Sequence, residues 1–249
     1  MLTSTCALAL ALALQAPTAP APPPAPPAPQ EDQAFRYFFQ NLVRDIKGLP
    51  SKETAWILGT ATVVALVAHP VDDNLQTWVA EQEPAGYTAI GRVAGDGWVQ
   101  AGGAIATYGV GVLGGHPKVR HIGSDLIRSQ MLNAILTRGL KLVASRERPS
   151  GGSSDSMPSG HASASFTTAA VLGSHFGPKV GVPAYAFAGF IGWTRIRDNA
   201  HWLTDVIIGS AIGTTVGLTV ARGHRDSAWT IVPTVTPNQV AIHIVRIGD

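Results

Sequence analysis

Apolar side chains recur at helical spacing along the chain from about residue 34 to residue 221. Residues 34–46 carry aromatic and aliphatic side chains on one face, which predicts an amphipathic helix. Proline and glycine residues then separate six longer apolar segments. These segments are Ala55–His69, Trp98–Leu113, Ile122–Leu142, Ala162–Phe176, Val180–Trp193 and Leu203–Ala221. The pattern predicts an all-α fold, a helical bundle of about six core helices that follows the amphipathic helix.

The last of these segments has a row of small residues on one side. Gly209, Gly213 and Gly217 lie four residues apart, so they share one face of the predicted helix. Without side chains, such a row lets a second helix approach closely. Asp205 begins the same row, which predicts that it lies at one end of a tightly packed helix face.

The N-terminal region differs in composition from the helical segments. Met1–Gln15 is rich in alanine and leucine and carries no charged side chain, which is typical of the apolar region of a secretory signal peptide. Cleavage is expected near Ala16 or Ala21, and the alternative is a low-complexity leader that is not cleaved. Residues 17–29 consist almost entirely of proline and alanine, and they predict an extended spacer.

The C-terminal region changes character again. Residues 229–235 and 240–247 are rich in valine, isoleucine and threonine, and Pro237-Asn238-Gln239 separates them. This pattern predicts a terminal β-hairpin, which we expect to cap the domain. The predicted organisation is therefore a signal peptide or apolar leader at 1–16, a linker at 17–33, a helical domain at 34–225 and a hairpin at 226–249.

Composition restricts the class of protein. Of the 249 residues, 45% are apolar and only 14% are charged, well below the roughly 25% of a typical soluble domain. Much of the helix surface must therefore be covered by protein or by lipid. The net charge of +2 argues against a nucleic-acid partner, and the single cysteine, Cys6, excludes a disulfide framework.

Two arrangements relative to a membrane agree with the charge pattern. Each apolar segment is near or below the ~20 residues that a span needs, and basic and acidic loops alternate. Six spans with an uncleaved leader would place the later polar motifs outside the cytoplasm. An exported helical domain without spans would follow a cleaved signal peptide. Both arrangements predict a site at the outer face of the cytoplasmic membrane of a bacterial envelope.

A first polar motif follows the third long apolar segment. Lys141 and Arg148 lie seven residues apart, two helical turns, so they share one face and could flank one anion. Pro149 then ends the helix. The alternative is a solvated basic helix end, since Arg138 and Arg146 are nearby. Considered without the other motifs, this pair favours that alternative.

A second motif, Pro158-Ser159-Gly160-His161, precedes the next apolar segment. Free backbone N–H groups at a helix start can bind phosphate oxygens, and Gly160 permits their close approach. Ser159 adds a hydroxyl donor, and His161 lies within reach of the same anion. Ordinary helix capping is the alternative interpretation.

A third motif joins two of the long segments. His201 and Asp205 are four residues apart and face the same way on a helix start. A carboxylate beside an imidazole fixes its tautomer and leaves the other ring nitrogen as nucleophile or base. Arg195 offers a planar, bidentate donor to an anion. A structural histidine–aspartate pair is the alternative.

The three motifs follow one another within 65 residues, and together they resemble the type 2 phosphatidic acid phosphatase superfamily. That superfamily shares its site with vanadium haloperoxidases and bacterial non-specific acid phosphatases. Its pattern is Lys-x6-Arg-Pro, Pro-Ser-Gly-His and Ser-Arg-x5-His-x3-Asp. This chain departs from it at Thr194, which stands where the pattern has serine and keeps the hydroxyl. The resemblance covers roughly Ala55 to Ala221.

The resemblance implies a metal-free, two-step phosphomonoesterase with no cofactor. His201 is expected to attack phosphorus and form a phosphohistidine, while Asp205 orients its ring. His161 is expected to protonate the leaving oxygen and then to deprotonate water. Vanadate is expected to inhibit. The non-bridging phosphate oxygens are expected to be held by Lys141, Arg148, Arg195, Ser159 and the Gly160 N–H.

The substrate class stays open at this stage. A lipid phosphate of the phosphatidic acid or undecaprenyl diphosphate type, or a broad range of monoesters, fits the motifs. The alternatives are a vanadate-dependent haloperoxidase and a catalytically inactive envelope binding protein. Asp72 and Asp73 are interpreted as a solvated loop start. The remaining histidines show no metal-ligand spacing and are interpreted as structural or exposed: His69, His116, His121, His175, His224 and His243.

Overall fold

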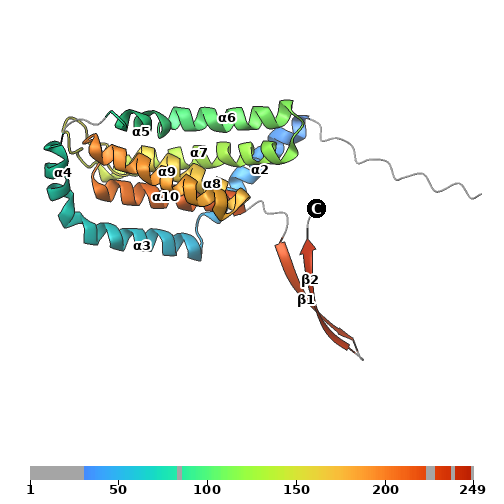
Figure 1. Cartoon of the computed structure of the whole chain (residues 1–249). Coiled ribbons are helices and arrows are strands. Elements are labelled where there is room, and N and C mark those ends of the chain that lie inside the picture. The colour runs from blue at the N-terminus through green and yellow to red at the C-terminus, as the bar shows by residue number, and fades with distance from the viewer. Residues whose placement is uncertain (1–30, 83–85, 223–227, 237–238, 248–249) are drawn as a thin grey trace, which may run out of the picture. The chain divides into compact units, whose positions relative to one another are not determined.

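The computed structural model describes the backbone of residues 31–82, 86–222, 228–236 and 239–247, and the side chains of residues 38–82 and 86–222 (Figure 1). The predicted signal peptide or leader at 1–16 lies outside the described residues. The same holds for residues 17–30 of the predicted linker.

The described part of the chain up to residue 222 is helical, which confirms the all-α prediction. Each predicted apolar segment corresponds to a helix, and the two ends of each helix lie within a few residues of the expected ones. In chain order the helices are α2 (Glu31–Gly48), α3 (Lys52–Ala68), the 3₁₀ turn η1 (His69–Val71), α4 (Asp72–Ala80), α5 (Thr88–Ala94), α6 (Gly97–Leu113), α7 (Pro117–Ala144), α8 (Gly160–Phe176), α9 (Pro178–Arg197) and α10 (Leu203–Arg222).

Local chemistry sets where several helices begin. The Ser51 hydroxyl accepts from the backbone N–H of Thr54 at the start of α3, and Asp96 accepts from two N–H groups at the start of α6. Pro117 and Pro178 occupy first helical positions, where a proline costs no hydrogen bond. Gly177 joins α8 to α9 with φ of 73°, a conformation that favours glycine.

Helices α8 and α10 pack with almost no side chain between them. A Cβ atom at Gly209, Gly213 or Gly217 would lie 2.5, 2.1 or 2.6 Å from a backbone oxygen of α8 or its N-cap residue. This contact confirms the close approach predicted from the glycine row. It also aligns the start of α8 with the start of α10, because the Ser159 N–H donates to the Asp205 carbonyl over 3.0 Å.

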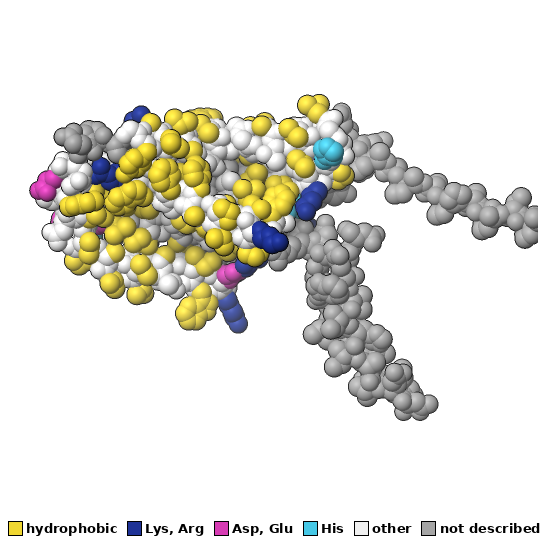
Figure 2. All heavy atoms as spheres, in the orientation of Figure 1, with side chains coloured by type: hydrophobic (Ala, Val, Ile, Leu, Met, Phe, Trp, Pro, Cys, Tyr) yellow, Lys and Arg dark blue, Asp and Glu magenta, His cyan; other side chains and the backbone are white. Residues whose placement is uncertain are grey.

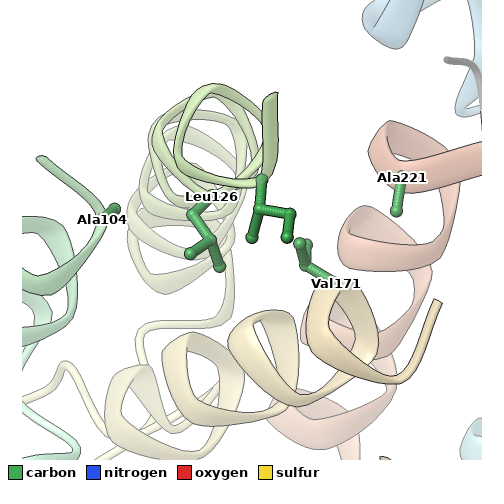
Figure 3. Packing of buried hydrophobic residues seen from close by; sticks show 5 residues of the cluster. Ala104, Leu126, Val171 and Ala221 are labelled. Carbon is green, nitrogen blue, oxygen red and sulfur yellow. The ribbon is translucent and has the colours of Figure 1, made fainter. Parts of the chain in front are cut away.

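Two apolar clusters form the core. The first joins α6, α7, α8 and α10 through Ala104, Ile122, Leu126, Val171 and Ala221, and Figure 3 shows Leu126 between Ala104 and Val171. The second joins α7 to α10 and is centred on buried Val216 and Val220, with Leu42 of α2 packed against it. The core therefore lies between α7, α8 and α10.

The outer faces of the bundle carry many large apolar side chains, seen as yellow spheres in Figure 2. Trp56 on α3, Trp98 on α6 and Leu142 on α7 are each about 80% exposed, at 77%, 80% and 82%. By length and composition, two described segments could cross a membrane: residues 52–80 and residues 203–222. Very little of the apolar stretch of the first segment is buried inside the protein, whereas more than half of that of the second is buried. An exposed apolar surface of this extent is typical of a protein that contacts lipid or a partner.

The C-terminal segment contains two backbone strands. β1 (Ala228–Thr236) pairs antiparallel with β2 (Gln239–Ile247), from Ala228 opposite Ile247 to Thr236 opposite Gln239. The turn expected at Pro237 and Asn238 lies outside the described residues. The terminal hairpin and its capping role therefore stay predictions.

Candidate active site

The three sequence motifs come together where α7 and α9 end and α8 and α10 begin. Ser156, in the segment between α7 and α8, connects them. Its carbonyl oxygen lies 3.4 Å from the Lys141 Nζ, and its hydroxyl donates to the Asp205 carboxylate. The sequence analysis did not single out Ser156, because its position carries no recognisable spacing to either partner.

His201 and Asp205 form the centre of the site. Nδ1 of His201 lies 3.7 Å from Oδ2 of Asp205 and 3.5 Å from the Ser156 hydroxyl. Because Nδ1 faces the carboxylate, Nε2 is the ring nitrogen left for a substrate. The imidazole is buried: His201 is 3% exposed, and its backbone carbonyl accepts a hydrogen bond from the Gln76 side chain.

A half-buried arginine holds the Asp205 carboxylate from the other side. Arg146 donates from Nη1 to Oδ1 of Asp205 over 2.8 Å and from Nη2 to Asp72 over 2.9 Å. Its guanidinium also lies over the Trp202 ring, 5.1 Å from the ring centroid. The backbone N–H of Trp202 completes the Asp205 set over 2.9 Å.

Asp72 is part of this network, so its interpretation as a solvated loop residue was wrong. Only 1% of its surface is exposed. Besides Arg146, it accepts from the backbone N–H of Thr204 over 3.2 Å and from the Thr204 hydroxyl over 2.6 Å. Asp72 thereby ties the start of α4 to the start of α10, which a buried carboxylate can do because its charge is paired.

His161, on the first turn of α8, faces the same end of the bundle. Its Nε2 lies 3.1 Å from the Arg92 carbonyl. Burial, and then the nearby charge of Arg195, lower the pKa of His161 to about 4. A bound anion would counter both effects, because its negative charge favours the imidazolium.

Arg195 is 4% exposed and presents an unused donor. Its Nη2 donates to Asp198, whereas its Nε is buried and lacks a hydrogen-bond partner among the described residues. Burial is the main cause that lowers the pKa of Arg195, and a guanidinium remains charged nonetheless. A buried donor without an acceptor is costly, and an anion at this position would supply the acceptor.

Lys141 and Arg148 meet at Asp155. Nζ of Lys141 donates to the Asp155 carbonyl, while Arg148 grips the Asp155 carboxylate with two N–H groups over 2.9 and 3.0 Å. The hydrogen bonds from Arg148, and then from Ser153, lower the pKa of Asp155 to about 2. Burial lowers the pKa of Lys141. The two cations therefore converge on one segment, but the prediction that they share a helix face was wrong: α7 ends at Ala144, so Arg148 lies in the segment that follows the helix.

The Pro158-Ser159-Gly160-His161 motif shows features of both helix capping and an anion-binding helix start. The Ser159 hydroxyl accepts from the Ala162 N–H over 3.4 Å, which is capping, and Ser159 is fully buried. A Cβ at Gly160 would meet no atom within 4 Å, so the backbone there is open to a ligand. Thr194, the departure from the family pattern, is buried and donates to the Ile191 carbonyl over 2.7 Å.

These features define an all-α protein with a histidine–carboxylate pair and three further cationic side chains at one end of its bundle, a class of site suited to an anion. Residues 124–229 match the family model of the PAP2 superfamily. The match includes all three motifs, and it agrees with the resemblance that these motifs carry.

Two curated proteins share sequence with part of the chain. The chain is 35% identical over 97 residues to lipid A 1-phosphatase of Porphyromonas gingivalis, which covers 38% of this chain and 22% of that protein. It is 28% identical over 94 residues to lipid A 4'-phosphatase of Helicobacter pylori, covering 38% of this chain and 48% of that protein. The chain thus spans about a fifth of the first relative's length and about half of the second's. No solved structure matches it.

Proposed function

We propose that the protein is a metal-independent phosphomonoesterase that acts on a lipid phosphate through a phosphohistidine intermediate. The observation that carries this proposal is the buried His201–Asp205 contact beside Arg195, whose Nε is buried and has no acceptor among the described residues. Nε2 of His201 would attack phosphorus in line. Asp205, held by Arg146 and Ser156, would keep Nδ1 protonated and stabilise the charged ring.

In the first step the bond between phosphorus and Nε2 of His201 forms as the bond to the ester oxygen breaks. His161 would deliver a proton to that oxygen, which leaves as an alcohol. Lys141, Arg148 and Arg195 would face the three non-bridging oxygens. Each cation ~4 Å from an oxyanion gains roughly 4 kcal/mol at an effective dielectric of about 20, so positioning and charge would supply most of the catalysis.

In the second step water attacks the phosphohistidine from the side that the alcohol has left. His161, now neutral, would take the proton of that water, and the bond between nitrogen and phosphorus breaks. Inorganic phosphate then leaves. Because the proton returns to His161, the enzyme is ready for another cycle without any other group changing its protonation state.

A groove beside the site supports a lipid substrate. A groove of about 500 Å³ lies between α6 and α7. Its apolar lining includes Trp98, Ile105 and Met131. Its polar lining includes Asp96 and Arg138. Arg138 precedes Lys141 by one helical turn, so the groove lies next to the cation pair. The names of the two curated relatives, both lipid A phosphatases, support the same substrate class.

The exposed apolar surface supports membrane association. Large apolar side chains on α3, α6, α7 and α9 are exposed. In water such a surface favours aggregation, whereas membrane lipid would cover it. We propose that the protein is exported and works at the outer face of the cytoplasmic membrane of a bacterium, where its substrate would be a membrane lipid.

The decisive experiment is phosphate release by the purified protein in detergent with EDTA, using a lipid phosphate and a water-soluble monoester in parallel. Release from the lipid, together with an acid-labile, alkali-stable phosphoprotein that His201→Ala loses, supports the proposal. Release from the soluble ester alone contradicts the lipid substrate. Activity that EDTA abolishes contradicts the metal-independent mechanism.

A further inference from the structure

A second polar cluster lies far from the candidate active site. It consists of His121 and Asp125 on α7 and His175 on α8. Asp125 precedes Lys141 by sixteen helical residues, which corresponds to about 24 Å at 1.5 Å per residue. The cluster therefore lies toward the opposite end of the bundle and takes no part in the proposed chemistry.

The three side chains already point ligand atoms at one another. Nε2 of His175 lies 2.8 Å from Oδ2 of Asp125, and Nε2 of His121 lies 3.6 Å from the same oxygen. All three ligand atoms lie within 4.8 Å of one another. The two imidazole rings meet edge to face with centroids 5.5 Å apart. The sequence analysis missed this cluster because 54 residues separate the two histidines.

A further shell of contacts fixes the Asp125 carboxylate. Its other oxygen, Oδ1, accepts from Nη2 of Arg128, which is itself buried. Arg128 also donates to Asp45 of α2 over 2.8 Å and to the Ser124 hydroxyl over 2.6 Å. Asp125 therefore turns Oδ2 toward the histidines, and such outer contacts commonly orient the ligands of a metal site.

We propose that His121, Asp125 and His175 bind a divalent transition metal ion, with Zn²⁺ the best match. Two imidazole nitrogens and one carboxylate oxygen form a common zinc ligand set, and tetrahedral bonds of about 2.0–2.1 Å place ligand atoms about 3.3 Å apart. The observed separations of 2.8 and 3.6 Å from the Asp125 oxygen to the two histidine nitrogens bracket this value. Water would occupy the fourth position beside His121, whose side chain is 41% exposed.

Binding has a defined proton balance and a defined effect. As the nitrogen–metal bond forms at Nε2 of His175, the N–H proton of the neutral ring would lie on Nδ1, so that Nε2 offers its lone pair to the metal. The metal would then link α7 to α8 at the end away from the catalytic groups. It is expected to stabilise the fold and to leave phosphatase turnover unchanged.

The test uses the full chain without an affinity tag, in detergent, equilibrated with about 10 μM Zn²⁺ and passed through a desalting column. The expected result is one zinc per chain by elemental analysis and a higher Tm with Zn²⁺ than with EDTA. His121→Ala and His175→Ala are each expected to lose both effects. His116→Ala, an exposed histidine near the same end of the bundle, is the matched control and is expected to retain them.

A His224→Ala/His243→Ala variant controls for zinc taken up by the tail histidines and is expected to keep the bound metal. No zinc retained by the wild-type chain, or equal zinc in the wild type and in His121→Ala, overturns the proposal. Since the readouts are metal content and Tm, failure of this site leaves the proposed phosphatase untouched. Loss of phosphatase activity in EDTA would contradict the purely structural role assigned to the metal.

Discussion

Arg146 donates an N–H to Asp205 over 2.8 Å, so a half-buried cation supports the carboxylate that faces the proposed nucleophile. Arg146 is a positioning residue by this geometry, since it contacts Asp205 and not the substrate. Its Nη2 contact with Asp72 and its place over Trp202 restrict the guanidinium to one orientation. Outer contacts of this kind orient functional groups, and their loss typically costs 10–100-fold in activity.

Replacement of this arginine should therefore lower kcat more than it changes KM. Arg146→Met is expected to reduce kcat roughly 10–100-fold with a soluble ester and to lower the free energy of unfolding by about 3 kcal/mol, since it leaves buried Asp72 and Asp205 without their cation. Arg146→Lys should restore part of kcat. Steady-state kinetics and urea denaturation measure both effects. Arg44→Ala, an exposed arginine on α2, should match the wild type, and a rise in KM alone would contradict the positioning role.

Loss of the proposed nucleophile should abolish turnover. His201→Ala is expected to leave no measurable phosphate release and no trapped phosphoprotein. Because His201 is buried, the variant should also lose about 1–3 kcal/mol of stability through the unsatisfied polar groups left behind, although the native far-UV circular dichroism should persist. Near-normal activity in a folded His201→Ala chain would refute the assignment.

Stability should depend on pH through His161. Burial, and then Arg195, lower the pKa of His161 to about 4 from the usual 6.5. Between these values the unfolded chain binds more protons than the folded chain, so the free energy of unfolding should fall as the pH falls from 6.5 to 4. His161→Gln removes this contribution. Urea titrations at several pH values should show that the free energy of unfolding falls less steeply with falling pH in His161→Gln than in the wild type. The lowered pKa of His201 adds a decrease of the same sign in both proteins.

Bound substrate should raise the pKa of His161, which burial and Arg195 lower in the free protein. A phosphate dianion beside the imidazole favours its protonated form. The apparent pKa of the general acid should therefore be higher in the pH profile of kcat than in that of kcat/KM. Identical values in the two profiles would place His161 away from the bound phosphate.

The contact between α8 and α10 should tolerate no side chain at its centre. A Cβ at Gly213 would lie 2.1 Å from the Ser163 carbonyl, so Gly213→Ala is expected to lower stability by about 3 kcal/mol. Gly139→Ala on α7 is the matched control, because its Cβ meets nothing within 4 Å. That variant should gain about 0.5–1 kcal/mol from its better helix propensity. Chemical denaturation compares the two, and equal effects would argue against the tight contact.

Vanadate should inhibit competitively with a soluble ester. It adopts the five-coordinate geometry of phosphorus during transfer, and a site complementary to that geometry binds it more tightly than it binds substrate. The inhibition constant should rise in Arg195→Lys, which offers one point charge in place of a planar donor. Inhibition kinetics in EDTA measure this, and insensitivity to vanadate would argue against the proposed mechanism.

The sequence determined the helices and the members of the site. Apolar periodicity, proline and glycine positions define the long helices because these depend on local spacing along the chain. The glycine row on α10 predicted its contact with α8, since residues four apart share a face. The three motifs likewise pointed to the two histidines and the three cations of the candidate site, because the residue types and their spacing can be read along the chain.

Only the tertiary structure decided how these groups are supported. Arg146 and Asp72 are 74 residues apart, and the sequence analysis gave neither a role in the site, yet they meet at the start of α10. The burial of His201 and the meeting of His121 with His175 likewise depend on which helices pack together. A local pattern gives the direction of a side chain on its own helix, but only the packing of distant helices determines what that side chain meets and whether water reaches it.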